Sequence, residues 1–206
     1  MFRLIRATAH SLPAQRTILV LGPMRGGTSM VAGMLRELGL FMGHRIQPKV
    51  HEDEEFAQAA HGSYAYIKEL IEARNREFNV WGVKYPPLLH ALPGLFNALR
   101  HPFLVVVLRH PDAVLLSAAR RDKIDLAESM RRYARYLADL QCLLTWPCAI
   151  GAVHFEQGLE DPLRLADQLA GFTGLEPSRE QLHNAALFVH YGDYRHTSLD
   201  KARHAV

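Results

Sequence analysis

Glycines and an arginine follow the apolar run "TILV" in the stretch "LGPMRGGTSM", residues 21–30. Gly22 and Gly27 have the spacing of the phosphate-binding sequence G-x-x-x-x-G-K-[ST], but Thr28 stands where its lysine would be. Arg25 supplies a cation inside the loop instead. Three interpretations are open for the stretch alone: a triphosphatase loop that lost its lysine, a glycine-rich turn, or a phosphate loop for a different donor.

The expected chemistry of this loop is anion binding. A loop that leads from a strand into a helix leaves backbone N–H groups unpaired at the positive end of the helix dipole. Gly26 and Gly27 let the backbone approach a phosphate closely, and Thr28 and Ser29 add hydroxyl donors. We therefore expect Arg25, Gly26, Gly27, Thr28 and Ser29 to bind an anionic ligand, with a solvated Arg25 as the alternative.

A second cation ends the apolar run "FLVVVLR" at Arg109. Magnesium-dependent phosphate-loop enzymes usually place an aspartate at the end of a second core strand. The nearest acidic residue after any other apolar run is Glu156. The pattern predicts a donor whose charge is met by guanidinium groups rather than by magnesium. The twelve histidines form no metal-binding spacing, so no metal is expected.

The elements that must position these residues alternate between short apolar runs and helical patterns, which favours a parallel α/β sheet. We predict strands over 17–22, 80–84, 103–109 and 149–155. Helices are predicted over 27–39, 53–77, 87–99, 112–121, 125–144, 161–173 and 177–190, and segment 41–55 has no clear periodicity. The expected fold is a three-layer α/β/α domain over 1–206, with a central, mainly parallel sheet like that of phosphate-loop nucleotide hydrolases.

Composition narrows the class of protein. The chain has 206 residues, 49% hydrophobic and 22% charged, with a net charge of +3 that suits a small anionic ligand. No basic tract is interleaved with aromatics, so no nucleic-acid partner is expected. No window of 18 apolar residues and no secretory signal occurs, and Cys142 and Cys148 cannot form a disulfide framework. We expect a cytoplasmic protein with no membrane partner.

Two motifs resemble the sulfotransferase family that uses 3′-phosphoadenosine 5′-phosphosulfate (PAPS). "RGGTS", residues 25–29, matches the family pattern [K/R]-[S/G]-G-T-[S/T], which binds the 5′-phosphosulfate. "RHPDAVLLS" places Arg109 and Ser117 eight residues apart, the spacing of the family's arginine and serine that bind the 3′-phosphate. The order and spacing of both motifs make a coincidence improbable.

Looser similarity extends the resemblance over about residues 17–175. "WGVKYPPLLH" places Lys84 at the family's catalytic lysine, and "VHFEQGLEDPLRLADQLAGFTGL" is similar to a late segment of bacterial members. Arg195 in "YRH" corresponds to the basic C-terminal loop over the 3′-phosphate. This chain has K-Y-P-P where bacterial relatives often have K-D-P-R or K-E-P-R. Pro86 replaces the catalytic histidine of the cytosolic eukaryotic branch.

The general base is expected in the acidic cluster "HEDEEF", residues 51–56, because some relatives draw a catalytic glutamate from this region. His51, Glu52, Glu54 and Glu55 are the candidates, and Glu52 and Glu55 would share a helical face if the next helix began early. Alternatively, acidic residues at a helix start do no more than favour the helix dipole.

The resemblance implies a sulfotransferase that transfers a sulfuryl group from PAPS to a hydroxyl or amine of a small-molecule or glycan acceptor. Arg25 and Lys84 would stabilise the transferring group, and Arg109 and Ser117 would hold the donor. Two alternatives stay open: a sulfotransferase-like nucleotide-binding protein without turnover, and a phosphate-loop kinase that acts on a small molecule.

Overall fold

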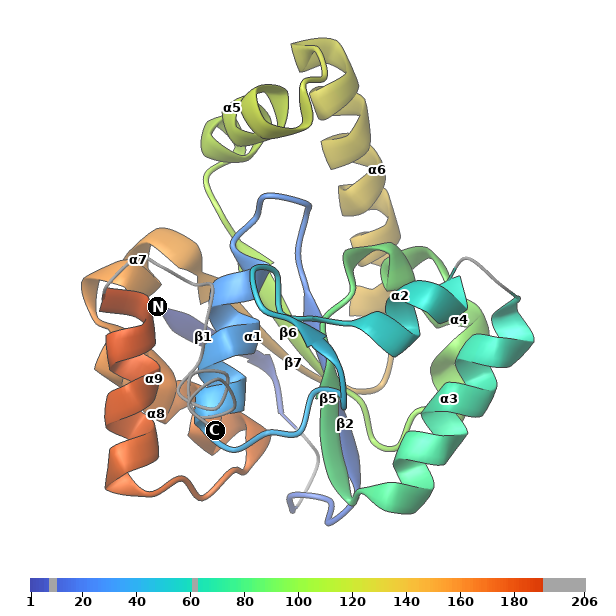
Figure 1. Ribbon diagram of the computed structural model, residues 1–206, viewed down its shortest axis with the longest axis vertical. Helices are drawn as coiled ribbons and strands as arrows, with labels where there is room; N and C mark the ends of the chain where they lie inside the picture. Colours follow the sequence, from blue (N-terminus) through green and yellow to red (C-terminus); the bar gives the residue numbers. More distant parts are fainter. Residues whose placement is uncertain (8–10, 61–62, 191–206) are drawn as a thin grey trace.

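A five-stranded sheet forms the centre of the computed structural model, which describes residues 1–7, 11–60 and 63–190 (Figure 1). The strand order is β1-β7-β6-β2-β5. The strands are β1 (Phe2–Arg6), β2 (Arg16–Leu21), β5 (Val80–Val83), β6 (Phe103–Leu108) and β7 (Ala149–His154). All neighbouring pairs are parallel except β1 with β7, which is antiparallel. The predicted α/β fold with a mainly parallel sheet is confirmed.

Helices cover both faces of the sheet. Successive side chains of a strand point to opposite faces, so Ile18 and Val20 join one apolar cluster while Leu19 and Leu21 join the other. The first cluster lies under α1 (Thr28–Glu37), α7 (Phe155–Glu160), α8 (Pro162–Thr173) and α9 (Arg179–His190). The second lies under α2 (Glu54–Ala60), α3 (Tyr64–Glu77), α4 (Leu92–Leu95), α6 (Leu126–Leu144) and the 3₁₀ helix η1 (Pro86–His90). A further 3₁₀ turn, η2 (Phe96–Ala98), follows α4.

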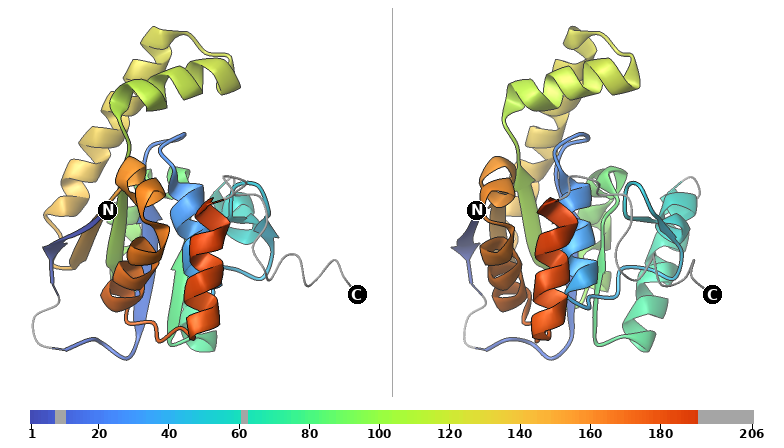
Figure 2. Two further views of the ribbon diagram at one scale, coloured as in Figure 1. Left: turned by 90° about the vertical axis from the view of Figure 1, so that its left-hand side faces the viewer. Right: turned by 60° about the vertical axis from the view of Figure 1, so that its left-hand side comes forward.

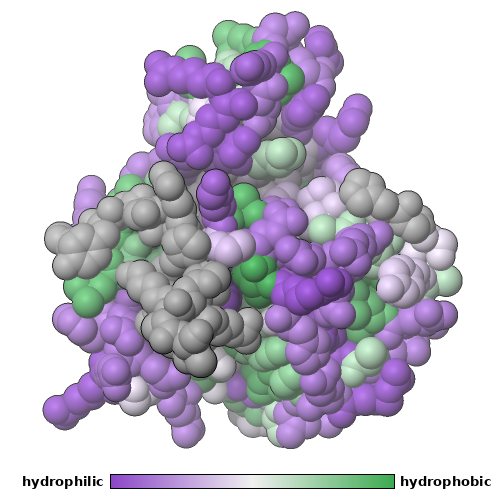
Figure 3. Space-filling view, in the orientation of Figure 1, coloured by the Kyte–Doolittle hydropathy of each residue, from purple (hydrophilic) through white to green (hydrophobic). Residues whose placement is uncertain are grey.

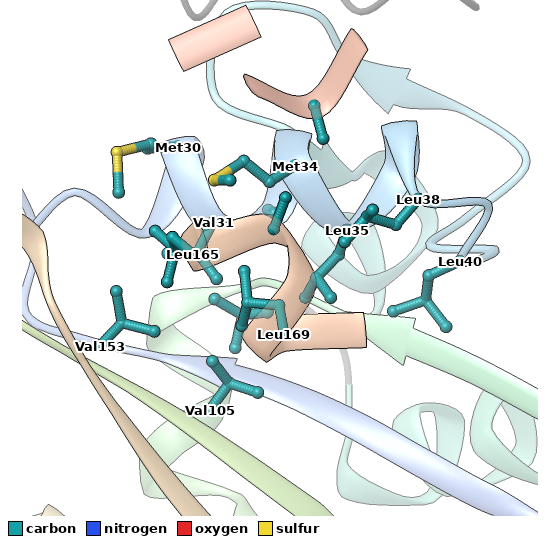
Figure 4. Close-up of a cluster of buried hydrophobic side chains, with 14 of the residues drawn as sticks. Met30, Val31, Met34, Leu35, Leu38, Leu40, Val105, Val153, Leu165 and Leu169 are labelled. Carbon is teal, nitrogen blue, oxygen red and sulfur yellow. The ribbon is translucent and has the colours of Figure 1, made fainter. Parts of the chain in front are cut away.

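The core explains why the apolar runs predicted the strands. Every residue of β2 is buried, as expected for a strand that is covered on both faces. Figure 4 shows α1 pressed against the sheet and α8. The side chains that meet there are Met30, Val31, Met34, Leu35, Val105, Val153, Leu165 and Leu169. This packing fixes the start of α1, and therefore the glycine-rich loop before it.

Helix α5 (Pro111–Asp122) packs beside the upper part of α6 and stands beyond the carboxyl edge of the sheet, whereas α6 runs down beside the sheet (Figures 1 and 2). Hydrophilic residues cover much of the face seen in Figure 3. No helix in the described ranges is both long and apolar enough to cross a membrane.

The exposed Cys142 lies in α6, and the buried Cys148 precedes β7; both are free thiols.

Several elements differ from the sequence prediction. The helix predicted over 53–77 is divided into α2 and α3, and Ser63 before α3 has extended backbone angles (φ −105°, ψ 158°). The helix predicted over 87–99 is divided into η1, α4 and η2, because prolines remove backbone donors at the start of η1 and of α4. Strand β1 and the six-residue α7 were not predicted.

Segment 41–55 forms a small antiparallel pair, β3 (Ile46–Gln47) with β4 (Glu52–Asp53). Its register sets Gln47 opposite Glu52. Two-residue strands are too short to give an apolar pattern, so the sequence did not reveal them. The pair carries Glu52 to the edge of the main sheet where β5 ends, as the contacts below show.

Candidate active site

Cations follow three neighbouring parallel strands. Strands β6, β2 and β5 are adjacent, and parallel strands present their carboxyl ends at one edge of the sheet. Arg109 follows β6, the loop that contains Arg25 follows β2, and Lys84 follows β5. The fold thereby brings together three candidates that lie far apart in the sequence.

The glycine-rich loop has an unusual backbone. Arg25 (φ 65°) and Gly27 (φ 88°) have left-handed conformations, and Gly27 is the N-cap residue of α1. A Cβ atom at Gly27 would lie 2.1 Å from the Phe155 ring, so this position requires glycine for space as well as for its φ angle. Gly26 N donates to the carbonyl of Pro23 over 2.8 Å. The loop is thus a tight turn that opens onto the N-terminus of α1.

The Arg25 side chain forms an ion pair with Asp122, at the C-terminal end of α5. Arg25 Nε lies 3.3 Å from Asp122 Oδ2, and a second nitrogen contacts Asp122 Oδ1. The Arg25 side chain is 29% exposed. The guanidinium therefore faces a carboxylate that an incoming anion must replace or join.

Arg109 supports the loop. Its Nη1 donates to the Arg25 carbonyl over 2.8 Å, and its guanidinium carbon lies 4.8 Å from the centroid of the Phe155 ring. Ser117, the seventh residue of α5, lies roughly 9 Å along the helix axis from Pro111. The Ser117 side chain is half-buried, and its hydroxyl has no hydrogen-bond partner among the residues that the structure describes.

Lys84 is buried, with 3% exposure. Its Nζ donates to the Val50 carbonyl over 2.9 Å and to Glu52 Oε1 over 2.6 Å. Ser29 Oγ donates to the same Val50 carbonyl over 3.1 Å. The first turn of α1, the end of β5 and the β3–β4 pair therefore meet at one oxygen atom. Burial lowers the pKa of Lys84, although the Glu52 carboxylate acts in the opposite direction.

Glu52 and Glu55 lie in different elements and have different partners. Glu52 lies in β4 and α2 begins at Glu54, so Glu52 and Glu55 do not share a helical face; that expectation was wrong. The strand pairing of β4 delays the helix start. Glu52 contacts Lys84, whereas Glu55 contacts Arg74 of α3.

His51 is fully buried, with a left-handed backbone (φ 54°). Its Nδ1 lies 3.1 Å from Arg36 Nη1, and its ring meets the Phe188 ring edge-on at 5.4 Å. These contacts lie with α1 and α9, in the packed layer under the sheet. Arg195 lies outside the described residues.

Two acidic residues were missed by the sequence interpretation. Asp53 is buried with Arg74, its Oδ2 3.2 Å from Nη2, and burial raises the pKa of Asp53. Asp122 meets Arg25 across 97 residues of sequence. The sequence around Asp53 does not distinguish it from the other acidic residues of the cluster 51–56. The sequence around Asp122 does not show its partner, because the contact with Arg25 exists only in the folded chain.

The remaining glutamate candidate, Glu54, begins α2, and its Oε2 lies 3.9 Å from Arg45 Nε. Glu156, the acidic residue nearest the end of an apolar run, accepts a hydrogen bond from His110 N over 3.0 Å. Within residues 1–7, 11–60 and 63–190, no group of three or more histidine, cysteine, aspartate or glutamate side chains is placed to hold a metal ion. The described charged groups at the strand ends are consistent with an anionic ligand.

Solved structures are known that are similar to this chain. No protein-family model and no curated protein matches the chain. Among solved structures, the sulfotransferase domain of the Synechococcus PCC 7002 olefin synthase matches with a TM-score of 0.61 and 16% identity, over 87% of this chain and 80% of that domain. The chain has a sulfotransferase-type fold.

Two further structures with this fold are similar. Sulfotransferase STF1 from Mycobacterium tuberculosis H37Rv has a TM-score of 0.61 and 16% identity, over 95% of this chain and 77% of that protein. Mouse sulfotransferase SULT7A1, solved in complex with PAP, has a TM-score of 0.58 and 11% identity, over 86% of this chain and 65% of that protein. The resemblance drawn from "RGGTS" and "RHPDAVLLS" is confirmed for the fold.

Proposed function

We propose that the protein is a sulfotransferase that transfers a sulfuryl group from PAPS to a hydroxyl or amine of a small-molecule or glycan acceptor. The observation that carries the proposal is the row of cations after β6, β2 and β5, namely Arg109, the loop with Arg25, and Lys84. The sulfotransferase-type fold supports it. Residence in the cytoplasm and a single domain over 1–206 stay predictions.

The residues at this edge suit a donor with two anionic ends. The N–H groups at the start of α1, with Thr28 and Arg25, suit the 5′-phosphosulfate. The Ser117 hydroxyl, which has no hydrogen-bond partner among the described residues, and the Arg109 guanidinium suit the 3′-phosphate. Gly27 leaves space beside the Phe155 ring that a Cβ would fill. The donor set therefore fits PAPS by charge and by backbone shape.

Bound PAPS supplies an activated sulfuryl group and a diphosphonucleoside leaving group. With PAPS bound, Lys84 Nζ would donate a hydrogen bond to the bridging oxygen between sulfur and the 5′-phosphate, on which negative charge grows as the bond from sulfur to that oxygen breaks. We assign the general base to Glu52, because its carboxylate lies 2.6 Å from Lys84 Nζ and is 20% exposed, so it can accept the acceptor proton. Glu55 forms an ion pair with Arg74, and His51 is fully buried, so both are weaker candidates for the base.

The competing functions predict different ligands. A kinase binds ATP with magnesium and needs a carboxylate at a strand end, whereas β5 and β6 are followed by Lys84 and Arg109. A binding protein without turnover would hold the nucleotide and transfer nothing. These two alternatives can be separated from a sulfotransferase by measuring ligand preference and turnover independently.

The test is titration calorimetry with 3′,5′-diphosphoadenosine (PAP), ADP and ATP, each with and without magnesium. We expect PAP to bind at least roughly 10-fold more tightly than ADP, since each well-placed charged contact contributes more than a neutral one. Magnesium should leave PAP binding unchanged. Equal or tighter binding of ADP, or a requirement for magnesium, would contradict the proposal.

A further inference from the structure

The turn that joins α5 to α6 protrudes beyond the carboxyl edge of the sheet (Figures 1 and 2). We call residues 119–132 the hairpin tip. Lys123 ends α5 with a left-handed backbone (φ 54°), and Asp125 begins α6 as an N-cap that accepts a hydrogen bond from Glu128 N over 2.6 Å. Two helix caps within three residues give the tip a defined shape.

Two large apolar side chains of the tip are exposed to solvent. Leu126 is 51% exposed and Met130 is 55% exposed. They are four residues apart in α6, so they are neighbours on one face of the helix. In Figure 3, hydrophobic surface lies among hydrophilic surface over this end of the molecule. The tip therefore presents a small apolar surface that the described part of the chain leaves uncovered.

The end of α5 carries an excess of positive charge. Arg120, Arg121 and Lys123 are exposed, and none of them has an ion-pair partner among residues 1–7, 11–60 and 63–190. Asp122 lies among them in the sequence, but its carboxylate is paired with Arg25. The three cations can therefore bind an external anion without first breaking an ion pair.

The start of α6 does not neutralise this charge. Glu128 accepts hydrogen bonds from Arg131 Nε over 3.0 Å and from Arg132 Nε over 2.7 Å, so two cations share one carboxylate. Lys123 is three residues before Leu126, which keeps their Cα atoms within about 11 Å of each other. Positive charge and exposed apolar surface therefore occur together at the tip.

A lipid bilayer with anionic headgroups matches both features. Apolar side chains enter the boundary between headgroups and acyl chains, while lysine and arginine side chains reach the lipid phosphates. A soluble polyanion would pair with the cations but leave Leu126 and Met130 in water. A partner helix would follow the exposed face of α6 as far as Leu137, which is 44% exposed and lies about 16 Å from Leu126 along the helix axis. A bilayer reaches only the protruding end, where the cations are.

We propose that the hairpin tip binds the surface of an anionic lipid bilayer, with Leu126 and Met130 at the boundary with the acyl chains. The three cations at the end of α5 bind lipid phosphates. The sequence predicted no membrane partner because it has no apolar window long enough to span a bilayer, but binding to the surface needs no such window. The proposal does not depend on the sulfotransferase function, since these residues lie outside the candidate site.

Surface binding would also orient the candidate site. Arg109, the loop with Arg25, and Lys84 follow strands at the carboxyl edge of the sheet, and the hairpin tip lies beyond that same edge (Figures 1 and 2). Asp122, within the tip, pairs with Arg25. A protein held by its tip therefore has this edge of the sheet directed toward the lipid.

The test is sedimentation with vesicles of two compositions, phosphatidylcholine alone and phosphatidylcholine with about one third phosphatidylglycerol. The unaltered protein should bind the anionic vesicles at least roughly 10-fold more tightly than the neutral ones, and a rise in salt concentration to about 0.5 M should weaken this binding. No binding to the anionic vesicles, or equal binding to both compositions, would overturn the proposal.

A pair of variants locates the apolar contact. The double variant Leu126→Ser, Met130→Ser should weaken binding to anionic vesicles by roughly 10-fold or more, whereas Leu137→Ser should leave it within about twofold. All three side chains are exposed, so urea denaturation should show wild-type stability. If the double variant is less stable, Met130→Ser alone should still weaken binding by roughly threefold. Equal losses in the double variant and Leu137→Ser would assign the contact to the whole face of α6, as for a partner helix, and overturn the proposal.

A second pair of variants tests the cations. Arg121→Gln should weaken binding to anionic vesicles by about 5-fold, as expected for one cation at a charged lipid surface. Arg76→Gln removes the same charge from an exposed position in the last turn of α3 and should leave binding within about twofold. Equal effects would mean that the net charge of the whole protein attracts the vesicles, which would contradict a binding site at the tip.

Polyglutamate, a soluble polyanion, separates lipid binding from attraction to negative charge alone. It should bind at least roughly 10-fold more weakly than the anionic vesicles, because it offers no apolar phase for Leu126 and Met130. Binding of polyglutamate as tight as that of the vesicles, and unchanged in the double variant, would assign the tip to a soluble acidic partner and overturn the proposal.

Discussion

The side chain of Arg109 donates a hydrogen bond to the backbone carbonyl of Arg25 over 2.8 Å. One candidate phosphate ligand thus holds the loop that carries another, although the two lie 84 residues apart. The loop needs this support, because Arg25 has a left-handed backbone that costs free energy in a residue with a side chain. Arg109 therefore has a structural task in addition to its proposed contact with a phosphate.

Replacement of Arg109 can distinguish its support of the loop from its proposed contact with the 3′-phosphate. Arg109→Ala should weaken PAP binding by roughly 30-fold or more, as expected when one partner of a charged contact is removed. Adenosine 5′-phosphosulfate, which lacks the 3′-phosphate, should lose much less affinity. Calorimetry with both nucleotides is the measurement, and Arg120→Ala on the exposed face of α5 is the charge-matched control. Equal losses for both nucleotides would mean that Arg109 acts only through the loop.

The ion pair between Arg25 and Asp122 predicts that the Asp122 carboxylate competes with an anionic ligand for the Arg25 guanidinium. Asp122→Asn should tighten PAP binding by about 2- to 5-fold, the range expected for releasing a partly exposed ion pair. Glu72→Gln removes the same charge from an exposed pair on α3 and should not change PAP affinity. Weaker PAP binding in Asp122→Asn would show instead that the carboxylate positions Arg25 for the nucleotide.

Burial of Lys84 makes stability depend on pH. The pKa of Lys84 in the folded state is lowered from 10.5, mainly by desolvation. At pH values between the folded-state pKa and 10.5, the unfolded chain therefore binds more protons than the folded chain. The free energy of unfolding should therefore rise with pH across that window, by at most about 1.4 kcal/mol per pH unit from this group. Below the folded-state pKa, the penalty for burying the ammonium is constant.

Lys84→Met removes this dependence. Urea denaturation at a series of pH values should show that the wild type gains stability relative to Lys84→Met as pH approaches 10.5. Lys68→Met, an exposed replacement on α3, controls for the loss of one positive charge. A difference between wild type and Lys84→Met that does not change with pH would contradict the prediction.

Gly27 and Gly171 form a matched pair of glycines. Gly27→Ala should destabilise the protein by about 2 kcal/mol or more, because it combines a positive φ with a clash against Phe155. Gly171 lies in α8 with nothing within 4 Å of an added Cβ, so Gly171→Ala should stabilise the protein by about 0.5–1 kcal/mol. Thermal and urea denaturation measure both effects. Similar behaviour of the two variants would refute the constrained geometry of the loop.

The sequence predicted the elements that depend on local pattern. The continuous apolar runs of β2, β5, β6 and β7 are typical of strands buried on both faces, and each of these strands lies within about one residue of its predicted range. The glycine-rich turn before α1 was predictable because its glycines and the start of the helix lie within ten residues of one another. The positions of Arg109 and Lys84 after their strands followed from the same runs.

The contacts of those residues depend on tertiary structure and could not be predicted. Nothing near Asp122 indicates that α5 carries it to Arg25. The placement of Glu52 beside Lys84 depends on a two-residue strand pair, which is too short to leave a pattern in the sequence. The functional roles proposed for Arg25, Lys84, Glu52, Arg109 and Ser117 stay predictions.

The two free thiols differ in a way that provides an optical probe of the α5–α6 region. Burial raises the pKa of Cys148 to about 11, so at neutral pH it holds almost none of the thiolate that reacts with maleimides. Cys142 is exposed on α6. A single dye can thus be attached to the unaltered chain, and its emission would report changes in the surroundings of α6 as nucleotide is added.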